Sequence, residues 1–177
     1  MKQKYKIQGN VYIEKEIPHY IKLVKKIENF LMVKFRNLEL LTEALTHESL
    51  SYHINLKNKQ AKVKSSQRLE FLGDKVLDLA LSSYLRKTTE LSEHDMTKLL
   101  WTFRSNKFLA HIARKHLDLA KYILMSKAQH EVKANYNTKN LADAVEAIFG
   151  AIQDDQGYQK AEELIIRIYK SYIEDAI

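Results

Sequence analysis

The sequence predicts an all-α fold in a single domain, and three observations support that fold class. From Ile21 onward, apolar residues recur every three or four positions, which places them on one face of a helix. Residues that favour turns and end strands are scarce, because the 177 residues include only four glycines and one proline. The chain is 45% hydrophobic and 29% charged, which is typical of a globular domain long enough to enclose one core.

The N-terminal part of the chain divides into an extension and two helices. Residues 1–20 mix charged and aromatic side chains, and we expect an irregular extension or a short strand before a domain that covers residues 21–177. A second helix is expected over residues 38–50, with Asn37 as a candidate N-cap. The first helix precedes it and presents one apolar face, formed by Ile21, Val24, Ile27, Phe30 and Leu31.

Residues 55–66 interrupt the apolar pattern and predict a basic loop. Its lysines are Lys57, Lys59, Lys62 and Lys64. A run of this kind is usually solvated surface, whereas beside a nucleic-acid site the same lysines become candidate phosphate contacts.

Two further helices are expected after this loop. The first begins after Ser66 and includes the stretch QRLEFLGDKVLDLAL. The second is a long helix through residues 95–117, with Ser92 as its cap. Glu93 then lies in its first turn, where an acidic side chain suits the helix dipole.

The last third predicts a polar loop over residues 126–140 and two helices, over residues 141–155 and 157–177. The earlier of these has its apolar stripe on Leu141, Ala144, Val145, Ile148, Phe149 and Ile152. The final helix is expected to bury Ala161, Leu164, Ile165, Ile168 and Tyr172.

Two of the expected helices carry a pair of acids on one face. Glu70 and Asp74 are four residues apart, and Asp143 and Glu146 are three apart. The two carboxylates of each pair therefore share a helix face and repel each other. Small residues lie beside both pairs: Gly73 in the first helix, Ala147 and Gly150 in the second. Small residues allow two helices to approach closely, and we therefore expect the two pairs to form one cluster of four carboxylates.

A cluster of four carboxylates is unfavourable without a cation, because like charges a few ångströms apart cannot all ionise cheaply. Mg²⁺ prefers hard oxygen ligands and can activate a water for phosphodiester hydrolysis. The net charge of +7 favours a polyanionic partner. The alternative is that each pair is an exposed acidic face with basic neighbours, and spacing alone does not name a reaction.

The quoted motifs resemble those of the ribonuclease III family. RLEFLGDKVLDL is similar to the family's signature helix, and LADAVEAIFGAI to its second acidic motif. FRNLELLTEALTHESL and SNKFLAHIA resemble its opening and central helices, in the same order. The resemblance implies an all-α endonuclease domain that forms a homodimer and cleaves double-stranded RNA with Mg²⁺, or with Mn²⁺ as a substitute, in RNA processing that includes rRNA. Products of that family carry 5′-phosphate and 3′-hydroxyl ends.

The same resemblance implies roles for individual residues. Glu70, Asp74, Asp143 and Glu146 match the metal-site carboxylates, with Asp74 and Glu146 the most directly catalytic. Phe71 matches an aromatic residue that inserts into a pocket of the partner subunit, although its helical spacing alone would favour ordinary core packing.

Two departures from the family pattern bear on these expectations. Gln67 stands where the family usually has a glutamate. In the family, that glutamate and the acid matched by Glu93 shape the dimer cleft. Gln67 carries no charge, so an auxiliary acidic role at position 67 is in doubt. The family's nuclease domain usually continues into a double-stranded-RNA-binding domain, and this chain ends at Ile177, about where that domain would begin. We therefore expect either a truncated sequence or a naturally minimal nuclease, weak and salt-dependent RNA binding, and room for a separate RNA-binding protein.

Two other functions remain open from the sequence. One is a catalytically silent family member that acts as an RNA-binding or ribosome-associated scaffold. The other is a helix-turn-helix DNA binder that uses FRSNKFLAHIARKH, with Arg104, Lys107, Arg114 and Lys115 as its basic residues. The absence of cysteine and of an apolar run of about 18 residues favours a cytoplasmic protein without a membrane partner.

Overall fold

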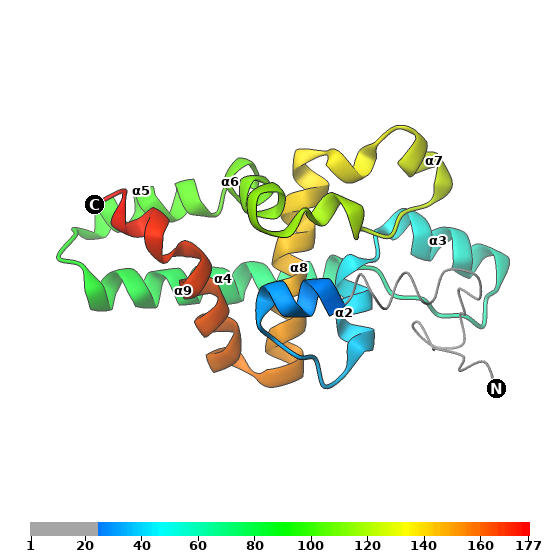
Figure 1. Ribbon diagram of the computed structural model, residues 1–177, viewed down its shortest axis with the longest axis horizontal. Helices are drawn as coiled ribbons and strands as arrows, with labels where there is room; N and C mark the ends of the chain where they lie inside the picture. Colours follow the sequence, from blue (N-terminus) through cyan, green and yellow to red (C-terminus); the bar gives the residue numbers. More distant parts are fainter. Residues whose placement is uncertain (1–24) are drawn as a thin grey trace.

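The computed structural model describes residues 25–177, and every regular element in this range is a helix, as the sequence predicts (Figure 1). The expected extension over residues 1–20 lies outside the described residues. The helices are residues 25–31, α2 (Leu38–Leu45), α3 (Glu48–Lys57), α4 (Gln67–Thr88), α5 (Glu93–Phe103), α6 (Asn106–Ile112), α7 (Lys127–Glu131), α8 (Thr138–Gln156) and α9 (Tyr158–Glu174). Short helical turns cover Ala113–Leu117, Leu119–Lys121 and Ala134–Tyr136. None of these helices is long and apolar enough to cross a bilayer.

Helix α8 is the central element of the core. It runs across α4 and also packs against α2, α6 and α9 (Figure 1). Its predicted apolar stripe is confirmed, because all six residues are buried. Four of the five residues expected inside α9 are buried as well; Tyr172 is only half-buried, and Tyr169 is the fully buried tyrosine of that helix.

The crossing of α4 and α8 depends on two glycines. A Cβ atom added at Gly73 would lie 1.8 Å from the carbonyl oxygen of Glu146. A Cβ atom added at Gly150 would lie 2.1 Å from the carbonyl oxygen of Leu69. The two backbones are therefore in direct contact, and the expectation that Gly73 allows a close helix approach is confirmed.

The predicted helix starts are mostly correct. The Asn37 side chain accepts a hydrogen bond from the Glu39 amide at 3.0 Å, and Ser92 accepts one from the Asp95 amide at 3.2 Å. Both are N-caps, as expected. Ser66 precedes α4, but its side chain makes no capping hydrogen bond.

Four predicted boundaries are wrong. The helix expected over residues 38–50 is divided at Thr46 and His47 into α2 and α3. The long helix through residues 95–117 breaks after Phe103, because Ser105 accepts a hydrogen bond from the Phe108 amide and starts α6. The polar loop over residues 126–140 contains α7, a helical turn and the start of α8. In the basic loop, α3 continues to Lys57. The segment after it is fixed by the side-chain amide of Asn55, which donates to the Val63 carbonyl and accepts from the Val63 amide, each at 2.8 Å.

Candidate active site

The crossing of α4 and α8 brings acids from both helices together. Glu70 of α4 and Asp143 and Glu146 of α8 each place a carboxylate oxygen within 4.8 Å of the others. These three residues are called the carboxylate triad below. Because α4 and α8 touch through Gly73 and Gly150, the triad is held by backbone contact rather than by a loop. The predicted meeting of the two acid pairs is thus present for three of the four acids.

Asp74, the fourth predicted acid, is bound by cations instead. One of its carboxylate oxygens accepts a hydrogen bond from Arg104 at 3.0 Å, and the other accepts one from Lys75 at 2.7 Å. Burial by itself raises the pKa of Asp74, but the hydrogen bonds from Lys75 and Arg104 outweigh burial and leave the pKa below its ordinary value. Asp74 is therefore firmly ionised.

The triad has too little compensating charge. Burial, and then the charges of Asp74, Glu70 and Asp143, raise the pKa of Glu146 to about 8. Burial, followed by the charge of Asp143, also raises the pKa of Glu70. Clustered oxygen ligands with too little positive charge nearby are the donor set that Mg²⁺ or Mn²⁺ prefers, so these residues fit a divalent cation.

Lys139 supplies the cation nearest to the triad. It lies one turn before Asp143 on α8, and its ammonium group donates to that carboxylate at 2.5 Å. The hydrogen bond to Asp143 raises the pKa of Lys139, so this side chain stays charged. The sequence already contained this signal as a lysine four positions before Asp143, but it was missed.

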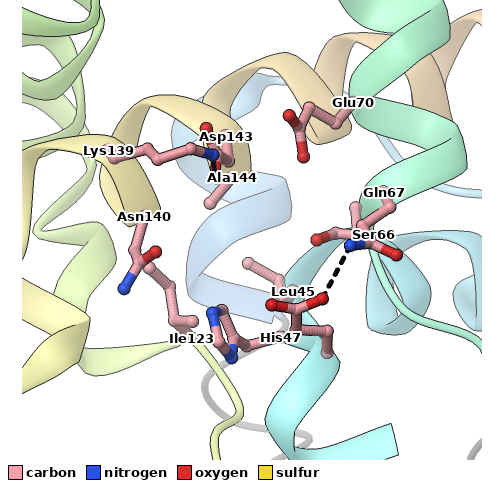
Figure 2. A pocket seen from close by; sticks show the side chains of 12 residues that line it. Leu45, His47, Ser66, Gln67, Glu70, Ile123, Lys139, Asn140, Asp143 and Ala144 are labelled. Atoms are coloured by element: carbon pink, nitrogen blue, oxygen red, sulfur yellow. Dashed lines mark hydrogen bonds and ion pairs between the residues drawn. The ribbon is translucent and has the colours of Figure 1, made fainter. Parts of the chain in front are cut away.

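A cavity of about 380 Å³ opens beside the triad. Figure 2 shows Glu70 and Gln67 of α4 on one side of it and Lys139, Asn140 and Asp143 of α8 on the other. His47, Glu48, Ser66 and Ile123 complete much of the lining. Charged and hydrogen-bonding groups therefore line a space next to a candidate metal centre. His47, Glu48 and Asn140 were missed because their proximity depends on where α3 and α8 lie relative to each other.

Gln67 and Glu93, the expected auxiliary pair, occupy different surroundings. Gln67 lines the cavity and donates a hydrogen bond to Glu48 at 2.7 Å, so a carboxylate is present beside position 67 after all. Glu93 begins α5 and accepts a hydrogen bond from Thr97 at 3.1 Å. Within the described chain, Glu93 is not part of this cavity lining.

Phe71 does not lie in the core. Its side chain is 72% exposed on α4, which excludes ordinary core packing. It lies at a second cavity, of about 600 Å³, whose apolar lining is Leu40, Leu69 and Leu72. Charged side chains, among them Arg68 and Asp154, complete the lining of this cavity.

The four predicted RNA-contacting lysines do not form one group. Lys64 lies at the Phe71 cavity and pairs with the buried Glu43 at 3.5 Å. Lys57 ends α3, and Lys59 and Lys62 follow in the loop, all exposed. In the described structure none of the four lines the cavity beside the triad.

The segment proposed as a DNA-reading helix is broken and partly buried. Leu109, Ala110 and Ile112 of α6 are fully buried. Arg104 bonds Asp74 and Asp78, and Arg114 bonds the Tyr136 carbonyl and Thr138. Two of the four basic residues are thus engaged within the chain, which does not favour the helix-turn-helix function.

Comparison with known proteins identifies relatives of this fold and site. The sequence model described as ribonuclease-III-like matches residues 37–173. A protein named ribonuclease 3 from Pelotomaculum thermopropionicum is 40% identical over 152 residues, which are 85% of this chain and 61% of that protein. Ribonuclease 3 from Clostridium kluyveri is 37% identical over 158 residues, 89% of this chain and 62% of that one. This chain therefore spans about three fifths of the length of these relatives.

A solved structure shows the same architecture. It is the nuclease domain of ribonuclease III from Campylobacter jejuni, described with a flexible region involved in dimer formation. The two superpose with a TM-score of 0.74 at 36% identity, covering 84% of this chain and 96% of that one.

Proposed function

This chain belongs to the ribonuclease-III-like family, and from that membership we propose that it is an endoribonuclease that hydrolyses phosphodiester bonds of double-stranded RNA in RNA processing. The observation that carries the proposal is the carboxylate triad, Glu70, Asp143 and Glu146, drawn from two crossing helices, with Glu70 and Asp143 lining a polar cavity. A scaffold that only binds RNA has no need of three clustered acids with too little counter-charge. The proposed domain covers residues 21–177, and a cytoplasmic location remains a prediction.

The proposed chemistry uses Mg²⁺, with Mn²⁺ as a substitute, held by the triad. A bound divalent cation would supply an activated water and stabilise the negative charge that develops on the phosphate oxygens. Attack of water on phosphorus with departure of the 3′-oxygen leaves a 5′-phosphate and, after protonation, a 3′-hydroxyl. The leaving 3′-oxygen needs a proton, and solvent water in the cavity beside the scissile P–O3′ bond would supply it.

The chain's own residues prepare this site in two ways. Lys139 holds Asp143 at 2.5 Å and brings a positive charge to the cavity wall where a phosphate would lie. The negative charges of Asp74, Glu70 and Asp143 all raise the pKa of Glu146. The protonation of Glu146 should therefore respond most strongly to added positive charge. Asp74 stays beside it as a fixed negative charge.

Double-stranded RNA is the proposed substrate because the chain is basic and is expected to recognise the A-form shape of a duplex rather than its sequence. A net charge of +7 attracts phosphates, and A-form duplexes are recognised mainly through phosphates and 2′-hydroxyl groups. Lys57, Lys59 and Lys62 are exposed and remain candidates for phosphate contacts. Binding should weaken steeply as salt rises.

We also propose a homodimer, formed through the surface around Phe71. The exposed ring lies at the cavity of about 600 Å³, whose lining combines leucines with charged side chains. In a two-fold dimer each subunit presents the same patch, so each Phe71 can fill the other subunit's cavity. Two active sites, one from each subunit, would then cut the two strands.

Incubation of the chain with a long RNA duplex tests the proposal, with Mg²⁺ or with EDTA, at low and moderate salt. Cation-dependent conversion to short duplexes with 5′-phosphate ends is the expected result. Binding without cleavage in every condition would instead support the silent scaffold. Preferential cutting or binding of duplex DNA would contradict RNA as the substrate.

A further inference from the structure

His47 lines the polar cavity but has no role in the chemistry above. Its ring caps α3, because Nδ1 accepts a hydrogen bond from the Ser49 amide at 3.2 Å and lies 2.9 Å from the Ser49 hydroxyl. That hydroxyl is itself held by the Ser126 amide at 3.2 Å. The backbone of His47 is fixed as well, since its amide donates to the Leu124 carbonyl at 2.9 Å. The ring therefore meets the cavity in one orientation.

These contacts decide which ring nitrogen of His47 carries the proton. A nitrogen that accepts a hydrogen bond from a backbone amide has no proton of its own, so the proton of the ring is on Nε2. Within residues 25–177, Nε2 has no hydrogen-bond partner. Figure 2 shows the ring at the wall of the cavity, on the side away from Glu70. His47 thus presents a fixed hydrogen-bond donor to the cavity.

Asn140 presents a fixed acceptor to the same cavity. Its Nδ2 donates to the Ala134 carbonyl at 2.9 Å, and this bond assigns the amide nitrogen to that side. Its Oδ1 has no partner among the described residues and lies at the cavity wall (Figure 2). Asn140 is three residues before Asp143 on α8, so the two side chains share a helix face. The acceptor is therefore close to the carboxylate triad.

A donor and an acceptor at one cavity suit a hydroxyl group better than a phosphate. Phosphate oxygens only accept hydrogen bonds, so the Asn140 oxygen would repel them, and the Lys139 ammonium is their better partner. A ribose 2′-hydroxyl both donates and accepts. It also lies on the carbon next to the one that bears the 3′-oxygen. A scissile phosphate held at the triad would therefore bring a 2′-hydroxyl to the neighbouring wall.

We propose that His47 and Asn140 bind the 2′-hydroxyl of a ribose that flanks the scissile phosphate. Nε2 of His47 donates to the hydroxyl oxygen, and Oδ1 of Asn140 accepts the hydroxyl proton. The pair selects RNA over DNA at the cleaved bond, whereas contacts to phosphates are common to both nucleic acids. This assignment rests on the proposed function, because it takes RNA as the ligand of the cavity.

Removal of single hydroxyls from the substrate tests the pair. A short RNA duplex with one mapped cut is prepared with a 2′-deoxynucleotide on either side of that cut in turn, which leaves the helix A-form. Wild type should cut one of these duplexes with a kcat/KM roughly threefold to tenfold below that for the all-ribose duplex, as expected for the loss of neutral hydrogen bonds. The measured quantity is this ratio, which a purely structural role of either residue would not change.

His47→Asn should bring the ratio to within about twofold of one. Asparagine keeps the cap of α3 but lacks the Nε2 donor, so the fold should be retained. Asn140→Ala removes the acceptor, should also lower the ratio, and keeps the test decisive if His47→Asn fails to fold. His53→Asn makes the same change at an exposed histidine of α3 outside the cavity lining and should keep the wild-type ratio.

Three results would overturn the assignment. They are an unchanged ratio in a folded His47→Asn or Asn140→Ala variant, equal cutting of all duplexes by wild type, and a dependence on the flanking base pair rather than on the sugar. Each would place the discriminating contact elsewhere.

Binding in EDTA separates this assignment from the nuclease function. Fluorescence anisotropy gives the affinity for an RNA duplex relative to a DNA duplex of the same sequence, and His47→Asn should lower this preference at least about threefold. A chain that cleaves no RNA but shows this loss would contradict the nuclease and support the pair. Cleavage of RNA with an unchanged preference would do the reverse.

Discussion

Gly73 lies directly against the backbone of Glu146: a Cβ atom at Gly73 would be 1.8 Å from the Glu146 carbonyl oxygen. The contact that sets the distance between α4 and α8 is therefore made by the residue that carries a site carboxylate. Core packing and site geometry cannot be changed separately at this position.

Gly73→Ala should consequently destabilise the fold and disable the site together. Overpacking typically costs about 1–3 kcal/mol, and a clash with backbone belongs at the upper end of that range. Urea unfolding should show the loss, and the variant that remains folded should bind Mn²⁺ more weakly. Lys87→Ala, on the exposed end of the same helix, is the control and should change neither. Wild-type metal affinity in folded Gly73→Ala would contradict the close approach.

The raised pKa of Glu146 predicts how stability depends on pH without a divalent ion. Because its folded pKa of about 8 exceeds the ordinary value of 4.5, the folded chain holds a proton more tightly than the unfolded chain. The associated stability is fully present below pH 4.5 and is lost as the pH rises through about 8. The loss amounts to no more than about 5 kcal/mol.

Unfolding curves in EDTA between pH 5 and 8.5 measure this effect, and Glu146→Gln isolates it. The variant cannot ionise, so its stability advantage over wild type should grow with pH. Saturating Mg²⁺ should remove most of the difference. An equal pH slope in wild type and Glu146→Gln would show that Glu146 titrates normally.

Glu146→Gln should also abolish RNA cleavage while leaving the dimer intact. The substitution removes the negative charge of the Glu146 carboxylate from the triad, and a loss of at least about 100-fold in cleavage rate is expected. Denaturing gels of labelled duplex RNA would measure the rate, and light scattering the subunit number. Glu174→Gln, in the last turn of α9, is the matched control. Normal cutting by Glu146→Gln would remove this residue from the site.

Phe71→Ala should weaken the dimer. Truncation of a central aromatic anchor typically costs about 2 kcal/mol or more of binding free energy, or roughly 30-fold in the dissociation constant. Sedimentation equilibrium would measure this change. Tyr52→Ala, at an aromatic residue of α3 that is 70% exposed, should leave the dissociation constant unchanged. If only the Tyr52 variant dissociated, the dimer surface would lie on α3.

The sequence predicts which acids share a helix face because helical periodicity is local. Glu70 and Asp74 share a face whatever surrounds them, and Gly73 between them indicates a close neighbour. Asn37 and Ser92 are likewise correct caps, because a cap depends on a few adjacent residues. These features need no knowledge of how distant helices pack.

Arg104 shows where such prediction stops. Its hydrogen bond to Asp74 joins two residues that are 30 positions apart, and it forms only because α5 folds back along α4. The break between α5 and α6 was missed for a related reason: apolar spacing continues through Phe103 and Phe108, and Ser105 alone marks the new start. Glu48 and Gln67 illustrate the same limit, because their hydrogen bond joins two helices whose relative placement no periodicity specifies.

Because α8 is buried along most of its length, its amide hydrogens should exchange with solvent only when the whole molecule unfolds. Asp143 and Glu146 belong to the helix expected to exchange most slowly, whereas α7 has no buried residue. Heating should therefore leave metal binding intact until global unfolding begins. The carboxylate triad would then be lost in one step, at the same temperature as the fold.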